Sequence, residues 1–130
     1  MIKTMILPTC QTYLVATSLA FAAEAPLRFQ CEWQSRSDLN SAQQEDIAGS
    51  IVFAYQPTGE GVGVLTGEGL GTKFEATHID RTIMAQVSYE ADGADIYERL
   101  EINSMTGSIK NWYESGTEAL LLEGRCTKLD

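Results

Sequence analysis

The chain holds few side chains of the kinds that form catalytic or metal-binding groups. Its only histidine is His78, in the segment Ala-Thr-His-Ile-Asp. A single histidine cannot build a multi-histidine zinc site, and no residue near it in sequence completes a serine triad. We interpret His78 as a strand residue held by a hydrogen bond. The alternation around it leaves open whether its ring points inward or outward.

Acidic residues gather in two places. Residues 90–95 (EADGAD) carry three carboxylates around a turn, but the ligand spacing of an EF-hand calcium loop is absent. Glu98 and Glu101 flank Arg99, and paired carboxylates can hydrolyse glycosides only at a separation that a sequence does not give. With 18 Asp and Glu in the chain, close pairs also arise by chance. We therefore expect no catalytic residue, no metal site, no cofactor and no enzymatic activity.

Six of the eleven glycines lie within residues 59–71 (GEGVGVLTGEGLG). A phosphate-binding loop would need Lys-Ser or Lys-Thr after its glycines and then a helix, and neither follows. We interpret the segment as a hairpin in which glycine permits sharp bending or a close approach of backbones, as at a barrel corner.

The elements that position these residues are predicted to be strands, because apolar residues recur with a period of two from Leu27 onward. Turn-forming Pro, Gly, Asp and Ser separate the runs, and such short turns favour antiparallel neighbours. The sequence predicts an all-β protein, an antiparallel up-and-down meander of about eight strands closed into a small barrel, with a two-sheet sandwich as the alternative. The runs are 27–34, 50–55, 61–65, 72–79, 82–89, 95–102, 107–114 and 118–127.

Residues 34–49 (QSRSDLNSAQQEDIAG) interrupt this pattern, because they are polar and do not alternate. Ser41 and Gln44 match a capping box, which predicts one or two helical turns. A connection of this length can be a lid or binding loop, or a solvated excursion over the surface, and the sequence leaves both open.

Residues 1–22 have the pattern of a secretory signal peptide. Positive charge at Lys3 precedes an apolar run over 13–23 that contains an Ala-x-Ala cleavage motif. The run is too short for a membrane span, which needs about 20 apolar residues. We expect a single mature domain over 23–130, located in the periplasm or secreted, with Cys10 discarded along with the signal.

The mature chain would keep two cysteines, Cys31 and Cys126. In an oxidising compartment such a pair predicts one disulfide. Cys31 shares a strand face with Phe29 and Trp33, and Cys126 shares one with Leu122, so both sulfurs lie on the apolar side. The bond would join the first strand to the last.

The charge of the chain narrows its partners. A formal charge of −9 argues against nucleic acid and anionic membrane surfaces, and it favours a basic protein. We expect a monomer. Trp112 and Tyr113 are adjacent on a strand and must point to opposite faces, so one of them is exposed and can anchor a partner.

The turn Ser104-Met105-Thr106-Gly107, followed by Trp112 and then by residues 116–120 (GTEAL), is similar to a pattern in bacterial inhibitors of C-type lysozyme. Those are small periplasmic or outer-membrane β-barrels with an S-x-x-G turn and a later K-G-x-x-A-x-L turn. The first turn also resembles the I-[DN]-x-x-T-G turn of many exported bacterial barrels.

The resemblance implies that the turn serine and the lysine enter the lysozyme cleft. Ser104 matches the serine, and Ser115 stands where the family has the lysine. Together with the strand aromatics, the candidate binding residues are Ser104, Thr106, Trp112, Tyr113 and Ser115.

Two functions fit these observations. The first is an exported β-barrel binding protein, inhibitor-like, whose loops act on a basic protein such as lysozyme. The alternative is a carrier of a small apolar ligand in the barrel interior, although large inward side chains could equally fill that space.

Overall fold

The computed structural model describes residues 25–129, which contain nine strands and no helix, and hence no helix able to cross a membrane. The expected signal peptide and Cys10 lie outside the described residues. The strands are β1 (Leu27–Asp38), β2 (Gln44–Asp46), β3 (Ser50–Gly59), β4 (Val62–Gly67), β5 (Lys73–Ile79), β6 (Thr82–Ala91), β7 (Ala94–Asn103), β8 (Ser108–Ser115) and β9 (Glu118–Leu129).

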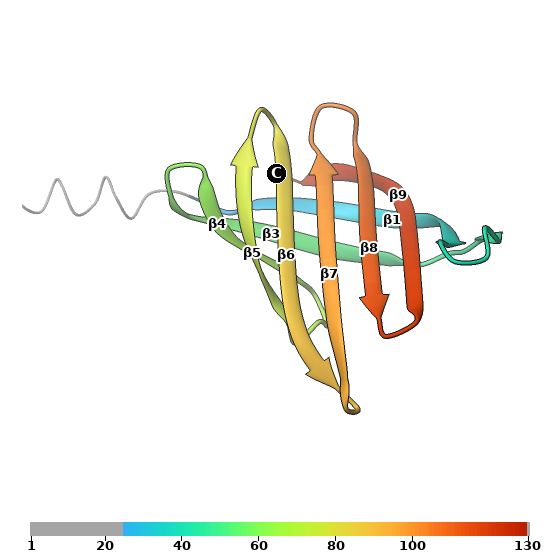
Figure 1. Cartoon of the computed structure of the whole chain (residues 1–130). Helices are drawn as coiled ribbons and strands as arrows, with labels where there is room; N and C mark the ends of the chain where they lie inside the picture. Colours follow the sequence, from blue (N-terminus) through green and yellow to red (C-terminus); the bar gives the residue numbers. More distant parts are fainter. Residues whose placement is uncertain (1–24, 130) are drawn as a thin grey trace, which may run out of the picture.

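The strands form one antiparallel meander that closes on itself. Each of β3 to β8 pairs with the next strand along the chain, and β1 pairs with both β3 and β9. Eight strands therefore make a closed barrel. The short β2 pairs with the C-terminal half of β1. In Figure 1, β1 and β3 run behind and across the upright strands β5 to β8. The predicted meander and barrel are confirmed, and closure rules out an open sandwich.

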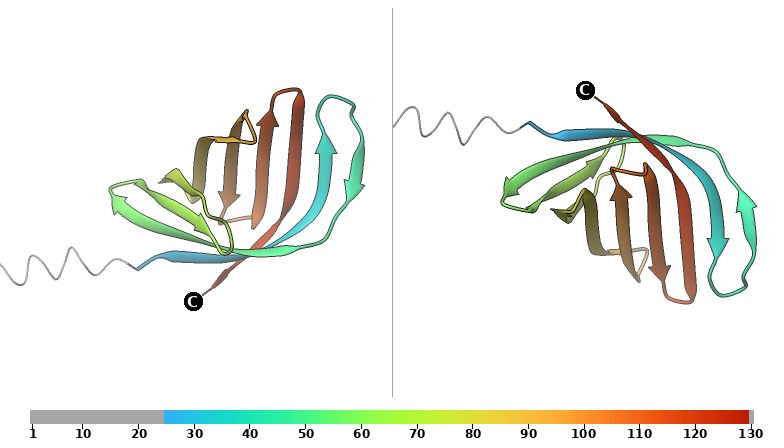
Figure 2. Two further views of the ribbon diagram at one scale, coloured as in Figure 1. Left: turned by 90° about the horizontal axis from the view of Figure 1, so that it is seen from below. Right: turned by 90° about the horizontal axis from the view of Figure 1, so that it is seen from above.

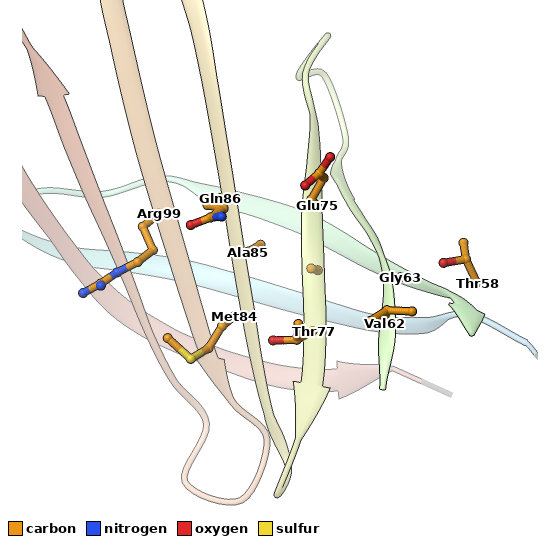
Figure 3. Close-up of a pocket in the computed structure, with 10 residues that line it drawn as sticks. Thr58, Val62, Gly63, Glu75, Thr77, Met84, Ala85, Gln86 and Arg99 are labelled. Carbon is orange, nitrogen blue, oxygen red and sulfur yellow. The ribbon is translucent and has the colours of Figure 1, made fainter. Parts of the chain in front are cut away.

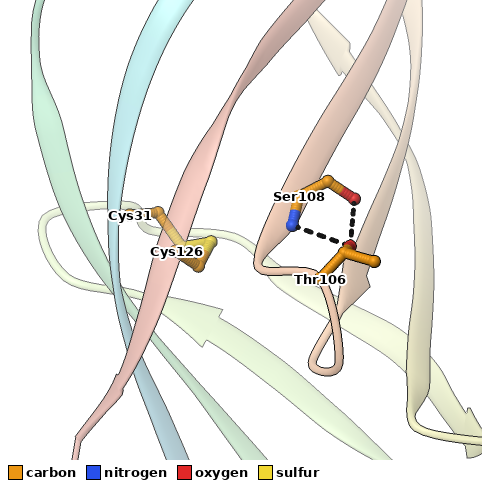
Figure 4. Close-up of a disulfide and its surroundings, with 4 residues drawn as sticks. All are labelled: Cys31, Thr106, Ser108 and Cys126. Carbon is orange, nitrogen blue, oxygen red and sulfur yellow. Dashed lines mark hydrogen bonds between the residues drawn. A yellow bond between two sulfur atoms is a disulfide. The ribbon is translucent and has the colours of Figure 1, made fainter.

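The disulfide joins β1 to β9, as predicted. Cys31 and Cys126 stand directly opposite each other in the β1–β9 ladder, with an S–S distance of 2.01 Å (Figure 4). The bond links the first and last strands of the barrel at the seam where the meander closes. A disulfide of this kind indicates an oxidising compartment.

Apolar side chains of the inner face fill one half of the barrel. Ten of them are essentially inaccessible to solvent, each below about 2% exposure: Tyr55, Phe29, Phe53, Phe74, Leu65, Ile83, Leu100, Ile102, Ile109 and Cys31. Trp33 is partly buried and packs against this core. Space is so limited there that a Cβ at Gly63 would lie 2.8 Å from the Tyr55 ring. The glycine-rich segment therefore permits close packing, as its composition predicts.

The helical turn predicted within residues 34–49 is wrong. β1 continues to Asp38, and the chain returns as β2 in a hairpin whose second strand, β2, is exposed. Asp38 Oδ1 accepts hydrogen bonds from the N–H groups of Asn40 and Ser41, so a carboxylate-stabilised turn replaces the helix start. An ion pair between Arg36 and Glu45 (3.3 Å) links the two strands across the hairpin.

Candidate functional site

Six carboxylates are carried, on both faces of the sheet, by the strand ends and turns at the end of the barrel that holds the β6–β7 and β8–β9 turns, which we call the acidic end. This is the lower end in Figure 1, seen from below in the left panel of Figure 2. Strand register brings them there, because Glu90 pairs with Asp95 and Ser115 pairs with both Ile96 and Glu118. The six residues are Glu90, Asp92, Asp95, Glu98, Glu114 and Glu118.

A hollow of about 620 Å³ lies at this end. Three carboxylates and two tyrosines line it, and no lysine or arginine of residues 25–129 does. The lining residues are Ser88, Tyr89, Glu90, Asp95, Ile96, Tyr97, Glu114 and Gly116. Negative charge beside aromatic surface suits a cationic group, since ammonium and guanidinium groups are attracted both to carboxylates and to ring faces.

Inside the acidic end, Tyr89 and Glu98 form a short hydrogen bond. The Tyr89 hydroxyl donates to Glu98 Oε2 at 2.6 Å, and both side chains are half-buried. This bond to a carboxylate, reinforced by burial and by the negative charge of Glu98, raises the pKa of Tyr89 from 10.0 to about 12. Tyr113 faces Glu98 directly across the β7–β8 ladder. The inner face here is therefore mixed, with two tyrosines and a carboxylate beside the apolar Val87 and Ile96.

Trp112 and Tyr113 point to opposite faces of β8, as the sequence predicts. Tyr113 lies on the inner face opposite Glu98, while Trp112 lies on the outer face opposite Arg99. The Arg99 guanidinium stacks over the indole ring, 4.2 Å from its centroid, and this contact orients both side chains. Arg99 Nε is buried without a hydrogen-bond acceptor.

Arg99 also borders a shallow groove of about 460 Å³ on the outer face of β4 to β7. Figure 3 shows its lining side chains, which come from neighbouring strands. Val62 and Met84 contribute apolar surface, and both are more than 40% exposed. Glu75, Gln86 and Arg99 cross the strands in one row. The groove is thus mixed in character, with opposite charges at its two sides.

The β7–β8 turn, which contains Ser104 and Thr106, uses its hydroxyl groups within the fold. Ser104 Oγ donates to the Arg81 carbonyl at 2.8 Å. Thr106 Oγ1 lies 3.1 Å from Ser108 Oγ and accepts from the Ser108 N–H (Figure 4). These hydroxyls therefore hold the turn in shape, while Met105 is 67% exposed at its tip.

The predicted binding residues do not form one cluster. Ser104 and Thr106 precede β8, and Ser115 is its last residue, so the two groups lie at opposite ends of an eight-residue strand. At a rise of about 3.3 Å per residue, that separation is about 25 Å. Only Tyr113 and Ser115 belong to the acidic end.

Two other sequence observations are settled by the register. His78 pairs with Ile83 on the inner face, where its ring meets that of Tyr55 edge-on at 5.4 Å between centroids. Glu98 and Glu101 point to opposite faces of β7, so they do not form a carboxylate pair. Among residues 25–129, no three His, Cys, Asp or Glu side chains are grouped so as to hold a metal ion.

Comparisons of the chain with family models, curated proteins and solved structures find no match.

The contact between Tyr89 and Glu98 is the site feature that sequence reasoning missed. The two residues are nine positions apart on neighbouring strands, and strand parity alone places each on a face without pairing them. The signal that could have found them is the Asp-Gly turn at 92–93. A two-residue turn there sets the β6–β7 register and brings Tyr89 diagonally beside Glu98.

Proposed function

We propose that the chain is an exported binding protein, periplasmic or secreted, that binds a basic protein through the acidic end of its barrel. The observation that carries this proposal is the hollow lined by three carboxylates and two tyrosines with no lysine or arginine. Complementary charge speeds encounter, and tyrosine gives a rigid apolar contact with a polar tip. The similarity to inhibitors of C-type lysozyme supplies a class of basic protein to test first.

Binding is measured with the exported, oxidised protein against a C-type lysozyme and against cytochrome c, a basic protein of unrelated fold, at low and at high salt. The test variant carries Glu90→Gln, Asp95→Asn and Glu114→Gln together. The matched control removes three exposed carboxylates elsewhere, through Glu32→Gln, Glu60→Gln and Glu68→Gln.

We expect the acidic-end variant to associate about tenfold more slowly at low salt, with a much smaller change in the control, because charges near an interface act mainly on the association rate. Binding of lysozyme but not of cytochrome c would support the inhibitor resemblance. Equal losses in the two triple variants, or no binding of either basic protein, would contradict the proposal.

A further inference from the structure

Three hollows adjoin one another on the outer face of the sheet, and together we call them the outer groove. The hollow of about 460 Å³ beside Arg99 shares Glu75 and Gln86 with a second hollow of about 320 Å³. This second hollow shares Ser88 and Tyr97 with the hollow of about 620 Å³ at the acidic end. The outer groove therefore follows β6 along the sheet, because successive residues of that strand line all three hollows.

The side chains that adjoining hollows share point away from the barrel core. Gln86 and Ser88 are exposed on β6, whereas Ala85 on the same strand is buried. Tyr97 pairs with Ser88, and its hydroxyl donates to Gln86 Oε1 at 3.3 Å, so its ring extends along the groove. These side chains therefore offer a ring, an amide and a hydroxyl group to a molecule that lies in the groove.

The two ends of the outer groove differ in chemistry. At one end Val62 and Met84 are 47% and 41% exposed (Figure 3). At the other end lie the carboxylates of Glu90, Asp95 and Glu114. Met84 and Glu90 both belong to β6, and at a rise of about 3.3 Å per residue they are about 20 Å apart. A small molecule cannot contact both ends, whereas an extended chain of about seven residues can.

An extended peptide in this groove makes its hydrogen bonds with side chains of the sheet. β6 pairs with β5 on one side and with β7 on the other, so its backbone groups are used within the sheet. A peptide on this face therefore cannot add to the sheet as a further strand. The N–H and C=O groups of its own backbone meet the Gln86 amide and the Ser88 hydroxyl instead, both of which are exposed.

We propose that the outer groove binds an extended segment of the basic partner, an inference that rests on the proposed function. The segment places an apolar side chain over Val62 and Met84 and a lysine or arginine at the acidic end, with Tyr97 in contact with the residues between them. Burial of exposed apolar surface favours the first contact, and complementary charge favours the second. The acidic end alone attracts any cation, whereas the groove selects a segment with both features at a fixed spacing.

The test titrates the exported, oxidised protein with acetylated, amidated peptides of equal composition. In the spaced peptide, Leu-Ser-Thr-Ser-Thr-Ser-Lys-Lys, leucine and the first lysine are as many residues apart as Met84 and Glu90. In the adjacent peptide, Leu-Lys-Lys-Ser-Thr-Ser-Thr-Ser, they are neighbours. Both peptides are also made in reverse chain order, and the tighter-binding spaced peptide is compared with its own adjacent control.

The NMR signals of the Met84 methyl group and the Gly116 amide report on the two ends of the groove. We expect the spaced peptide to shift both signals saturably. It should bind about fivefold more tightly than the adjacent peptide, which reaches only one end at a time.

Paired changes in protein and peptide assign the apolar end. Met84→Ser should weaken binding of the spaced peptide about fivefold, because apolar contact is lost. It should have no effect on a spaced peptide whose leucine is replaced by serine. Leu39→Ser is the matched control, since it removes an apolar side chain of similar exposure (50%) from the β1–β2 hairpin and should leave binding unchanged. Tyr97→Ala should weaken binding about threefold. Thermal unfolding of each variant checks that it is folded.

Equal binding of the spaced and adjacent peptides would overturn the inference, and so would equal losses in Met84→Ser and Leu39→Ser. Tighter binding of cellotetraose, an uncharged oligosaccharide, would assign the groove to a glycan instead. Shifts of the two groove signals when the protein alone is diluted would assign it to a second copy of the chain.

The proposed function can fail separately. If a basic protein binds through the carboxylates of the acidic end while the spaced and adjacent peptides bind equally, the proposed function stands and the groove falls as a peptide site. If the spaced peptide shifts the signals at both ends of the groove while no basic protein binds, the groove stands and the proposed function falls.

Discussion

At the scale of single residues, the two faces of each strand carry different chemistry. On β7, Glu98 points inward to Tyr89 and Tyr113, while its sequence neighbour Arg99 points outward to Trp112. One carboxylate and one guanidinium, adjacent in sequence, thus serve opposite surfaces of the barrel. The hydrogen bond between Tyr89 and Glu98 can be detected experimentally, because it raises the pKa of Tyr89.

Tyr89 should ionise near pH 12 in an absorbance titration of the tyrosinates, and Glu98→Gln should lower that pKa toward 10. Between pH 10 and pH 12 the folded protein keeps the phenol proton of Tyr89, whereas the unfolded chain loses it. The hydrogen-bonded pair therefore contributes its full stability only below pH 10. That contribution falls as the pH rises from 10 through 12. Tyr89→Phe identifies the transition by removing it. An unchanged titration in Glu98→Gln would contradict the assignment.

Gly124 is required by a close approach of two backbones. A Cβ there would lie 3.0 Å from Trp33 Cα and closer still to the Glu32 carbonyl oxygen. Gly124→Ala should therefore lower the free energy of unfolding by about 1–3 kcal/mol. Gly71→Ala is the control, since nothing lies within 4 Å of its added Cβ, and we expect it to be neutral or stabilising by up to about 1 kcal/mol. Denaturant unfolding of both variants measures this difference, and equal stabilities would show that the space at Gly124 can relax.

At the scale of elements, the seam between β1 and β9 holds the barrel closed. It combines a long antiparallel ladder with the disulfide between Cys31 and Cys126, whose residues are 95 apart in sequence. Linking the chain almost end to end restricts the unfolded state strongly, because the loop it closes is long.

Reduction of the disulfide should lower the free energy of unfolding by about 4–5 kcal/mol on the chain-entropy account. Denaturant curves with and without reductant measure the loss. A Cys31→Ala, Cys126→Ala double variant should resemble the reduced protein and gain no further change from reductant. If wild type were equally stable in both states, the ladder alone would account for closure.

The two faces of β8 make a second element-scale prediction. Tyr113→Ala should weaken binding of a basic protein more than Trp112→Ala does, since Tyr113 faces Glu98 across the β7–β8 ladder while the Trp112 ring is already covered by the Arg99 guanidinium. Trp112→Ala should instead cost about 0.5–1 kcal/mol of stability for the lost cation–π contact, beyond the loss of its packing. Affinity and unfolding measured on both variants separate the two roles. A larger affinity loss in Trp112→Ala would place the binding surface beside Arg99 and Trp112 instead.

Strand periodicity was enough to predict the meander, because alternation and short turns report directly on neighbouring strands, and the pair Cys31 and Cys126 in an exported chain predicted the disulfide that favours closure. It failed at residues 34–49, where a polar hairpin lacks an apolar face and Asp38 supplies the turn through its side chain. The predicted runs 72–79 and 82–89 did leave the two-residue turn at Asp80 and Arg81, although both residues adopt positive φ without a glycine. The acidic end depends on which strands become neighbours, so single residues such as Tyr89 gave no sign of it.

At the scale of the whole molecule, the barrel separates its two ends. One half is filled by the apolar core, and the end with the β6–β7 and β8–β9 turns gathers carboxylates and tyrosines. The β7–β8 turn, with Ser104 and Thr106, lies at the other end of β8. A partner that binds at one end of the barrel therefore contacts a surface that differs chemically from the surface at the other end.

The most direct measurement is an amide NMR map of the exported, oxidised protein as a C-type lysozyme or another bound basic protein is added. The account predicts perturbations centred on the acidic end, at residues 88–98 and 113–118, that weaken as salt is raised. Signals of residues 104–107 should stay unchanged. Perturbations centred on residues 104–107, with the acidic end unaffected, would contradict it.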